Sequence, residues 1–424
     1  MSRSFFCTLF VFVFFLPSTM VAQPADPSTL TGKIMSGYQG WFRIEGDGSG
    51  MGNFHYGPAD FGPGNCHFEM WPDMSEMEDD EKFLTRFKHA DGSAAHLFSS
   101  TNRKTVVRHF QWMEEHGIDG VFVQRFVGYT RNERSRNSFN VVMENVRYGA
   151  EKHNRVWAMM YDLSGGRSGD LMGSLVDDWK RLVDEDKIRE DRMYLRHNGK
   201  PVVSIWGIGF NDNRRYTLQE CLELITFLKD DPKYGGNTVK VGVPTYWREM
   251  TRDTLNDPLL HEIIRKADIV SPWSVGRFAN LRDVENYVRH VSVADGAWCK
   301  ENNVEYMPVV YPGFSWHNLM ISRNQPERAI FNQIPRLKGE FLSAQIKGHM
   351  DNGVTMIYQA MFDEIDEGTA IFKVTNSPPV GDGSRFVDYE GLPSDFYLKL
   401  LGDAAKELKQ KTGQRPPRVF RSRQ

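Results

Sequence analysis

Residues 118–162 decide the fold, because IDGVFVQR (residues 118–125) and VWAMMYD (residues 156–162) enclose a segment with helical periodicity. Both flanking runs are almost continuously apolar, which predicts strands covered on both faces, as in a parallel sheet. Between them, Phe139, Val142 and Val146 recur at the spacing of one helix face. The stretch therefore predicts a strand, a helix and a second parallel strand, the unit of α/β proteins.

The same unit recurs along the chain until eight strands are counted. The other six predicted strands cover residues 33–39, 201–206, 239–245, 268–272, 304–312 and 354–362. Further apolar stripes with helical spacing fall within residues 106–113, 171–182, 218–228, 259–264, 284–291, 337–346 and 396–408. Eight such units predict an α/β fold of the (β/α)8 TIM-barrel type. An open, doubly wound sheet shares the alternation, but the first strand lacks the GxGxxG fingerprint of that fold.

The chain is long for such a barrel. Its 424 residues exceed the ~250 of a typical barrel, so extended βα loops are expected. Two insertions stand out, at residues 43–95 and 374–393. No linker, low-complexity run or internal repeat divides the chain, so residues 23–424 are predicted to form a single catalytic (β/α)8 domain.

Residues 1–22 have the pattern of a secretory signal peptide. Arg3 supplies the positive charge, residues 5–16 form an apolar run too short to span a bilayer comfortably, and Ala22 offers a small residue for cleavage. We therefore expect an exported protein, secreted or periplasmic. No later run approaches ~18 consecutive apolar residues, so no membrane span is expected in the mature chain.

Charge and cysteine content argue against several classes of partner. A formal net charge of -3 gives no reason to expect nucleic acid. Of the mature cysteines, Cys221 lies on an apolar helical stripe, whereas Cys66 and Cys299 could pair. There is no CxxC or HExxH motif, so no metal and no cofactor is expected. Cys66, His67 and Glu69 could form a metal site, but a loop packed over the barrel mouth is the commoner explanation.

Substrates of (β/α)8 barrels bind at the carboxyl ends of the strands. Aromatic and polar residues occur at most of these ends, which favours an oligo- or polysaccharide as the bound partner, because sugar faces stack on rings and sugar hydroxyls need donors and acceptors. Each ring could instead simply cap the barrel. The predicted substrate-binding residues are Tyr38, Trp41, Gln124, Arg125, Tyr161, Asp162, Trp206, Tyr246, Trp273, Tyr311, Trp316 and His317.

The eighth predicted strand runs directly into DEIDEGT (residues 363–369), which contains four carboxylates within five residues. Glycoside hydrolysis needs two carboxyl groups about 5 to 9.5 Å apart, and a turn between Glu364 and Glu367 would bring theirs toward the short end of that range. Gly368 favours such a turn. A solvated acidic surface is the alternative, as is a set of calcium or magnesium ligands, although the DxDxDG spacing of a calcium loop is absent.

The segment FDEIDEGT resembles the NEWHEGT-type motif of glycoside hydrolase family 99, the endo-α-mannosidase family, and of its family 71/99-like secreted relatives. SGYQGWF (residues 36–42) and YLRHNGKPVVSIW (residues 194–206) are similar to the first and fourth strand regions of that family. The similarity in pattern extends over residues 32–408. It implies a (β/α)8 barrel that acts on α-linked glycans without a metal cofactor.

The resemblance also implies catalytic roles. Glu364 matches the first motif glutamate, expected to take the proton of the sugar 2-hydroxyl so that this oxygen becomes an internal nucleophile. Glu367 matches the second, expected to protonate the leaving group and later to activate water. Asp363, Ile365 and Asp366 replace the motif residues Asn, Trp and His.

The sequence thus predicts a glycoside hydrolase, secreted, that cleaves an α-linked polysaccharide or glycan, α-mannan-like in the first instance. The expected mechanism is retaining, independent of metal, and uses Glu364 and Glu367. Two alternatives remain: a barrel that binds carbohydrate without cleaving it, and a hydrolase of a different glycoside.

Overall fold

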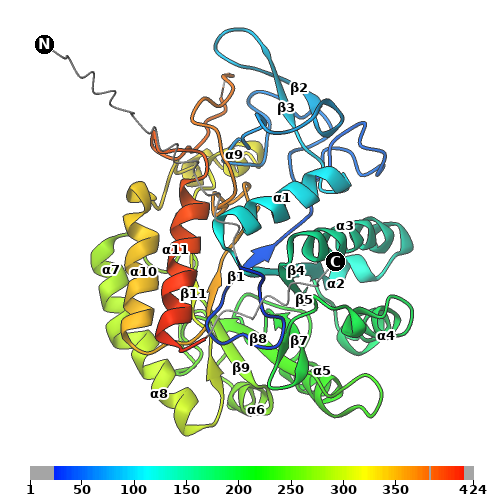
Figure 1. Ribbon diagram of the computed structural model, residues 1–424, viewed down its shortest axis with the longest axis vertical. Coiled ribbons are helices and arrows are strands. Elements are labelled where there is room, and N and C mark those ends of the chain that lie inside the picture. The colour runs from blue at the N-terminus through cyan, green and yellow to red at the C-terminus, as the bar shows by residue number, and fades with distance from the viewer. Residues whose placement is uncertain (1–22, 382, 415–424) are drawn as a thin grey trace, which may run out of the picture.

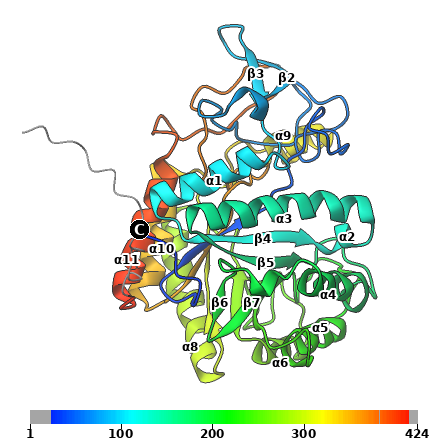
Figure 2. The same cartoon turned by 45° about the vertical axis from the view of Figure 1, so that its right-hand side comes forward.

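A computed structural model describes residues 23–381 and 383–414 of the chain. The predicted signal peptide, residues 1–22, lies outside the described residues. Parallel strands form a barrel wall, helices surround it, and a layer of loops covers one end (Figure 1, Figure 2). The predicted (β/α)8 fold is confirmed.

The order of the strands around the wall follows their order in the chain, and all neighbouring pairs in the wall are parallel. Each predicted strand is present, although the eighth is shorter than expected. The wall consists of β1 (Ile34–Tyr38), β4 (Gly120–Phe126), β5 (Val156–Asp162), β7 (Lys200–Trp206), β8 (Thr238–Pro244), β9 (Ile269–Trp273), β10 (Glu305–Tyr306), β11 (Val309–Val310) and β12 (Ile357–Gln359).

The wall closes through the seventh strand position, which holds both β10 and β11. β10 pairs with β9 and β11 pairs with β12, so one extended segment joins the two sides. Between the two halves, Met307 N donates to Val270 O at 2.9 Å and Tyr358 N donates to Pro308 O at 2.9 Å. Pro308 has no N–H of its own, which accounts for the break in the predicted strand at residues 304–312.

Helices cover the outside of the wall, and each predicted apolar stripe falls within a helix or in the helical turn adjoining it. The helix predicted to start at residue 218 begins there with a capping box. Thr217 Oγ1 accepts from Glu220 N at 3.1 Å, while Glu220 Oε2 accepts from Thr217 N at 2.8 Å. No helix in the described ranges combines the length and the apolar character needed to cross a bilayer. The helices are α1 (Arg103–His116), α2 (Val127–Thr130), α3 (Glu133–His153), α4 (Val176–Asp184), α5 (Leu218–Asp230), α6 (Leu259–Lys266), α7 (Leu281–Tyr287), α8 (Val293–Glu301), α9 (His317–Ser322), α10 (Glu340–Asp351) and α11 (Phe396–Lys411).

The two predicted insertions lie together at one end of the barrel. Residues 43–95 contain an antiparallel hairpin, β2 (Phe83–Lys88) and β3 (Ala94–Leu97), that the sequence analysis did not predict. Residues 374–393 run beside it, since Pro72 bridges to Val374 and Lys88 bridges to Val380. Figure 1 shows the hairpin and the orange loop of the second insertion in the same region. A short antiparallel strand, β6 (Arg196–His197), also adds to β7.

The three cysteines in the described ranges do not form a bridge. Cys66, Cys221 and Cys299 are all buried free thiols in the described part of the chain. The pairing of Cys66 with Cys299, which the sequence leaves open, is therefore absent. Cys221 lies on the buried face of α5, as the apolar stripe predicts.

Helices α1 and α11 approach each other closely at Gly402. A Cβ atom on Gly402 of α11 would lie 1.6 Å from the carbonyl oxygen of His116, at the end of α1. Gly402→Ala must push the two helices apart, and overpacking of this kind costs about 1–3 kcal/mol. We expect a lower melting temperature by calorimetry. A Cβ on Gly173 meets open space, so Gly173→Ala is the matched control, and equal melting temperatures for the two variants would contradict the close approach.

Candidate active site

The acidic segment after β12 folds back on itself. Ile365 N donates to Asp363 O at 2.9 Å, and Thr369 N donates to Glu364 O at 3.2 Å. Gly368 has a φ of 67°, a left-handed conformation that glycine adopts without strain. The chain therefore turns between Glu364 and Glu367, as the sequence predicts, and carries both side chains to the mouth of the barrel.

Asp363 fixes the start of this turn to the end of β1. Its carboxylate accepts the backbone N–H groups of Gln39 and Gly40, each at 2.8 Å. Burial raises the pKa of Asp363 to about 7 against the opposing effect of these two donors. The contact joins the first and last strands of the barrel at the level of the site.

Glu364 is held from two sides. Its Oε1 accepts from Gln39 Nε2 at 2.5 Å, and its Oε2 accepts from the Thr369 hydroxyl at 2.7 Å. The residue is only 4% exposed. Burial first, and then the charges of Glu367 and Asp366, raise the pKa of Glu364 well above its ordinary value of 4.5.

Glu367 lies three residues on and is more accessible, because its side chain lines an open cleft. Its backbone oxygen accepts from Ser315 N at 3.0 Å, which fixes the end of the turn. Burial and then the charge of Asp366 raise the pKa of the carboxyl to about 8. The indole N–H of Trp316 lies beside it and partly offsets that rise, although it stops short of hydrogen-bond geometry.

The two glutamates therefore have different environments although both pKa values are raised. Two donors, Gln39 and Thr369, point at Glu364, and donors stabilise the ionised form of a carboxyl group. Glu367 faces the cleft, where burial and the charge of Asp366 raise its pKa to about 8. Separated environments of this kind suit one base and one acid in the same site.

The cleft beside Glu367 encloses about 570 Å³. It opens at the carboxyl ends of β7 and β9, each of which ends in a tryptophan, Trp206 and Trp273. Their rings meet edge to face at 5.4 Å between centroids. The aromatic side chains that line the cleft are Trp206, Phe210, Trp273, Phe314 and Trp316.

A second aromatic group lies near Asp366. The imidazole of His55 stacks on Trp41 with 3.6 Å between ring centroids, and Phe126 stacks on the indole at 5.3 Å. His55 Nδ1 is 3.1 Å from Asp366 Oδ2. Burial lowers the pKa of His55 to about 3 and raises that of Asp366 to about 8. Both shifts favour the neutral form of each group.

Polar atoms without partners gather around these carboxyls. In the described chain, each of the following is buried and lacks a hydrogen-bond partner: Gln39 Oε1, Trp41 Nε1, Gln124 Oε1, Trp206 Nε1, Trp316 Nε1 and Asp366 Oδ1. Buried donors and acceptors are normally satisfied. Their concentration at the mouth is what a site for a ligand rich in hydroxyl groups requires.

The structure brings several predicted substrate-binding residues to this mouth. Gln124 Nε2 donates to Asp162 Oδ2 at 3.2 Å, and the charge of Asp162 helps to raise the pKa of Glu367. Burial raises the pKa of Asp162 itself to about 6. The predicted residues at the mouth are Trp41, Gln124, Asp162, Trp206, Trp273 and Trp316, together with Glu364 and Glu367.

Four other predicted binding residues face the helices instead. Tyr38 contacts His109 Nδ1 of α1 at 2.9 Å, and Arg125 and Tyr161 both contact Asp178 of α4, at 2.6 and 2.8 Å. Tyr311 donates to the Phe278 carbonyl. The physical reason is the two-residue period of a strand. At β4 and β5 two adjacent residues were predicted, and at β1 Tyr38 was predicted in place of its neighbour Gln39. Only one of two adjacent residues can face the mouth.

Two predicted binding residues lie outside the cleft lining. The Tyr246 hydroxyl accepts from Arg252 Nη1 at 2.7 Å. His317 begins α9, and its Nδ1 lies 3.0 Å from the Ala329 carbonyl oxygen. Both side chains are therefore engaged with neighbouring loops.

Three residues that hold or extend the site were not among those predicted from the sequence. Gln39 adjoins the predicted Tyr38 and takes the inward position, so strand alternation could have identified it. Thr369 is part of the quoted DEIDEGT segment. His55 lies in the first insertion, where no periodic pattern indicates which side chain reaches the barrel.

The cluster of Cys66, His67 and Glu69 serves the packing of a loop. Glu69 Oε2 accepts from the Ser315 hydroxyl and Glu69 Oε1 accepts from Asn318 N, each at 2.6 Å. In residues 23–381 and 383–414, no three His, Cys, Asp or Glu side chains converge on a common point as metal ligands do.

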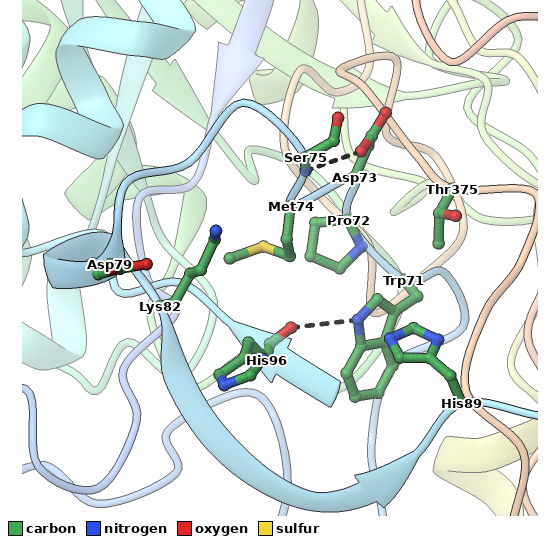
Figure 3. A pocket seen from close by; sticks show the side chains of 10 residues that line it. All are labelled: Trp71, Pro72, Asp73, Met74, Ser75, Asp79, Lys82, His89, His96 and Thr375. Carbon is green, nitrogen blue, oxygen red and sulfur yellow. Dashed lines mark hydrogen bonds between the residues drawn. The ribbon is translucent and has the colours of Figure 1, made fainter. Parts of the chain in front are cut away.

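A separate cavity of about 580 Å³ lies within the insertions (Figure 3). Trp71 Nε1 donates to the His96 carbonyl at 3.2 Å on one wall, and Lys82 and Met74 project from another. No predicted site residue lines it. The acidic turn opens into the tryptophan-lined cleft, not into this cavity.

Comparison with known proteins addresses the fold. No protein-family model matches the sequence, nor does any curated protein. Two solved structures of a family 99 endo-α-mannosidase from Bacteroides thetaiotaomicron, one in complex with bis-tris propane, match over 91% of this chain and 100% of theirs. Their TM-scores are 0.63 and 0.61, at 16% and 17% sequence identity. The chain shares the fold of these endo-α-mannosidases. At this identity the likeness establishes the fold, and an argument about chemistry must come from the residues of the site.

The raised carboxyl pKa values predict how stability depends on pH. Those of Asp366 and Glu367 are about 8 in the folded state, against ordinary values of 3.8 and 4.5. Between about pH 4 and pH 8 the folded protein holds more protons than the unfolded chain, so these groups contribute stability at low pH that is lost as pH rises through 8. Asp366→Asn removes one such group. Its melting temperature relative to wild type should therefore increase from pH 5 to pH 8.

Calorimetry at several pH values measures that difference. Asp403→Asn, at an exposed position on α11, is the control and should follow wild type throughout. A difference between Asp366→Asn and wild type that stays constant with pH would contradict the raised pKa of Asp366.

Proposed function

We propose that the protein is a secreted glycoside hydrolase that cleaves α-linked glycans, α-mannan-like polysaccharide in the first instance, by a metal-independent retaining mechanism. The observation that carries this proposal is the buried acidic turn. Glu364 is fixed by two donors behind it, while Glu367 opens on a cleft lined by tryptophans. The fold shared with endo-α-mannosidases supports it.

In the proposed first step, Glu364 acts as the base. Its carboxylate takes the proton of the sugar 2-hydroxyl, and the freed oxygen attacks the anomeric carbon within the same ring. The hydrogen bonds from Gln39 and Thr369 hold the carboxylate at a fixed place, so little reorganisation is needed.

Glu367 acts as the acid in that step. Its proton passes to the leaving oxygen as the glycosidic bond breaks, which leaves a three-membered ring between the first and second carbons of the sugar. In the second step Glu367 takes a proton from water, whose oxygen attacks the anomeric carbon, and Glu364 returns its proton to the 2-oxygen. Two inversions give net retention, and a pKa of about 8 keeps Glu367 protonated at the start.

The rest of the mouth suits a sugar. Trp206, Trp273 and Trp316 offer rings for stacking against pyranose faces. The unpartnered atoms of Gln39, Gln124 and Asp366 offer donors and acceptors for hydroxyl groups. A barrel that only binds glycans would have no need of two crowded, costly carboxyls at the bottom of its site.

The acid role predicts the behaviour of Glu367→Gln. An amide cannot donate the proton that a sugar leaving group requires, so hydrolysis of a natural glycan should fall by at least ~100-fold. A glycoside with an activated aryl leaving group should be much less affected, because that group needs little protonation. Steady-state kinetics on both substrates measures the contrast.

Glu223→Gln, an equivalent change on the exposed face of α5, is the control and should match wild type on both substrates. Melting temperature confirms that each variant is folded. Equal turnover of natural glycan by wild type and a folded Glu367→Gln variant would refute the assignment of the acid. Binding without cleavage by the wild-type protein would favour the non-catalytic barrel.

Catalysis by carboxyl groups alone also predicts insensitivity to chelators. Because both proton transfers use Glu364 and Glu367, activity on the glycan should survive exhaustive EDTA treatment followed by dialysis. The measurement is the residual rate before and after addition of calcium, magnesium or zinc. Loss of activity that one of these ions restores would instead make the acidic turn a ligand set.

A further inference from the structure

Arginines from three different loops lie around the cleft that contains Glu367. Arg214 follows β7, Arg277 follows β9, and Arg328 belongs to the long loop after β11; all three line the cleft. Arg323, from the same loop as Arg328, lies close enough for its charge to act on Glu367. A neutral glycan requires stacking and hydrogen bonds, but it gives no reason for cations to converge from separate parts of the chain.

Arg214 already has a structural role. Its Nε and Nη2 donate to the Asp212 carboxylate at 2.8 and 3.0 Å, and its Nη1 donates to the Tyr216 hydroxyl at 3.0 Å. The guanidinium also lies over the rings of Trp206 and Phe210, at 5.3 and 4.9 Å from their centroids. Its charge is neutralised by Asp212, and it serves to hold the aromatic wall.

Arg277 and Arg328 are engaged only in part. Arg277 donates from Nε to Asp253 at 2.9 Å, and its two terminal nitrogens have no hydrogen-bond partner in the described chain. Arg328 donates from Nη1 to Gln325 Oε1 at 2.8 Å and has no carboxylate within ion-pair distance in the described residues. Each therefore presents unused N–H groups of a planar guanidinium, which match the paired oxygens of a carboxylate or sulfate.

The acidic side chains that line the same cleft contribute little uncompensated negative charge to oppose such an anion. Asp212 is neutralised by Arg214. Glu367 is the proton donor of the proposed reaction. Glu327, beside Arg328 in a short 3-10 helix (Pro326–Arg328), is the remaining acidic side chain of the lining and stands at the exposed edge.

We propose that the cleft binds an acidic glycan, whose carboxylate or sulfate groups are held by Arg277 and Arg328. The inference rests on the proposed glycoside hydrolase function and narrows its substrate to charged relatives of the mannan-like glycan. Carboxylate and sulfate share the recognition chemistry, since both present paired anionic oxygens to a guanidinium fork.

The test uses matched pairs of glycans that differ in charge alone. One pair is a sulfated α-mannan and its chemically desulfated form; the other is an α-mannan oxidised to the uronic acid at its primary hydroxyl groups and its carboxyl-reduced form, with unmodified α-mannan as an additional reference. Binding and cleavage by the full-length protein are both measured. We expect at least tenfold preference for the charged member of one pair at low salt, and loss of that preference in 0.5 M NaCl because exposed charges are screened. The pair that shows the preference identifies the anion.

Variants connect the preference to the arginines. Arg328→Gln should lower the charged-to-neutral ratio of kcat/KM about fivefold, the effect of one exposed charge pair. Glu327→Gln removes the neighbouring negative charge and should raise the same ratio. Arg282→Gln, at an exposed arginine of α7 that does not line the cleft, is the control and should leave the ratio unchanged.

The outcomes separate the two proposals. Equal or better binding and cleavage of the neutral forms would overturn the acidic-glycan inference and leave the glycoside hydrolase standing. Selective binding of charged forms without cleavage would support the inference and refute the proposed catalysis. A charge preference that Arg328→Gln leaves unchanged would overturn the assignment to these arginines. Failure to bind or cleave any of the glycans would overturn both.

Discussion

The carboxylate of Asp363 accepts the backbone N–H groups of Gln39 and Gly40, and the arrangement of the mouth depends on this contact. It ties the end of β12 to the end of β1, where the barrel returns to its first strand. With Asp363 fixed, the following residue projects toward Gln39, whose side chain then holds Glu364. The two residues that follow β1 thus supply the backbone anchor of the turn and a side-chain hydrogen bond to Glu364.

The cost of this arrangement is electrostatic. Four carboxyls within five residues are taken out of water, and burial raises the pKa of each. Structures tolerate such crowding when protons or hydrogen bonds replace the lost solvation. Here backbone N–H groups donate to Asp363, side chains donate to Glu364, and His55 contacts Asp366. Glu367 is the one carboxyl of the four that lines the open cleft. The raised pKa of Glu367 is thus a consequence of its burial and of the charge of Asp366 beside it.

Periodicity predicted the barrel well because both of its signals are local. Apolar runs and helical stripes located all eight strand positions and the surrounding helices, and the count of eight decided the topology. The position of DEIDEGT after the last strand predicted the turn and its two glutamates. The seventh strand is split because Pro308 lacks an N–H, which the predicted run at residues 304–312 did not anticipate.

Side-chain direction and loop packing were the parts that local patterns could not supply. Tyr38, Arg125 and Tyr161 stand at strand ends, as predicted, but the two-residue period turns them toward α1 and α4. The inward positions belong to Gln39, Gln124 and Asp162. The two insertions have no period, so neither the β2–β3 hairpin nor the contact of His55 with Asp366 could be derived from sequence spacing.

That contact bears on how the resemblance to the endo-α-mannosidase motif should be understood. The motif residue directly before the second glutamate is His in that family and Asp366 in this chain. An imidazole is nevertheless present beside the turn, because His55 reaches it from the first insertion and stacks on Trp41. A histidine on the turn itself would be positioned by the barrel, whereas His55 is positioned by the first insertion, a loop of more than fifty residues. The packing of this loop depends in turn on Glu69 and on the second insertion. The acidic turn is therefore placed by the barrel, whereas the imidazole and the rings beside it are placed by the insertions, which the barrel fold does not determine.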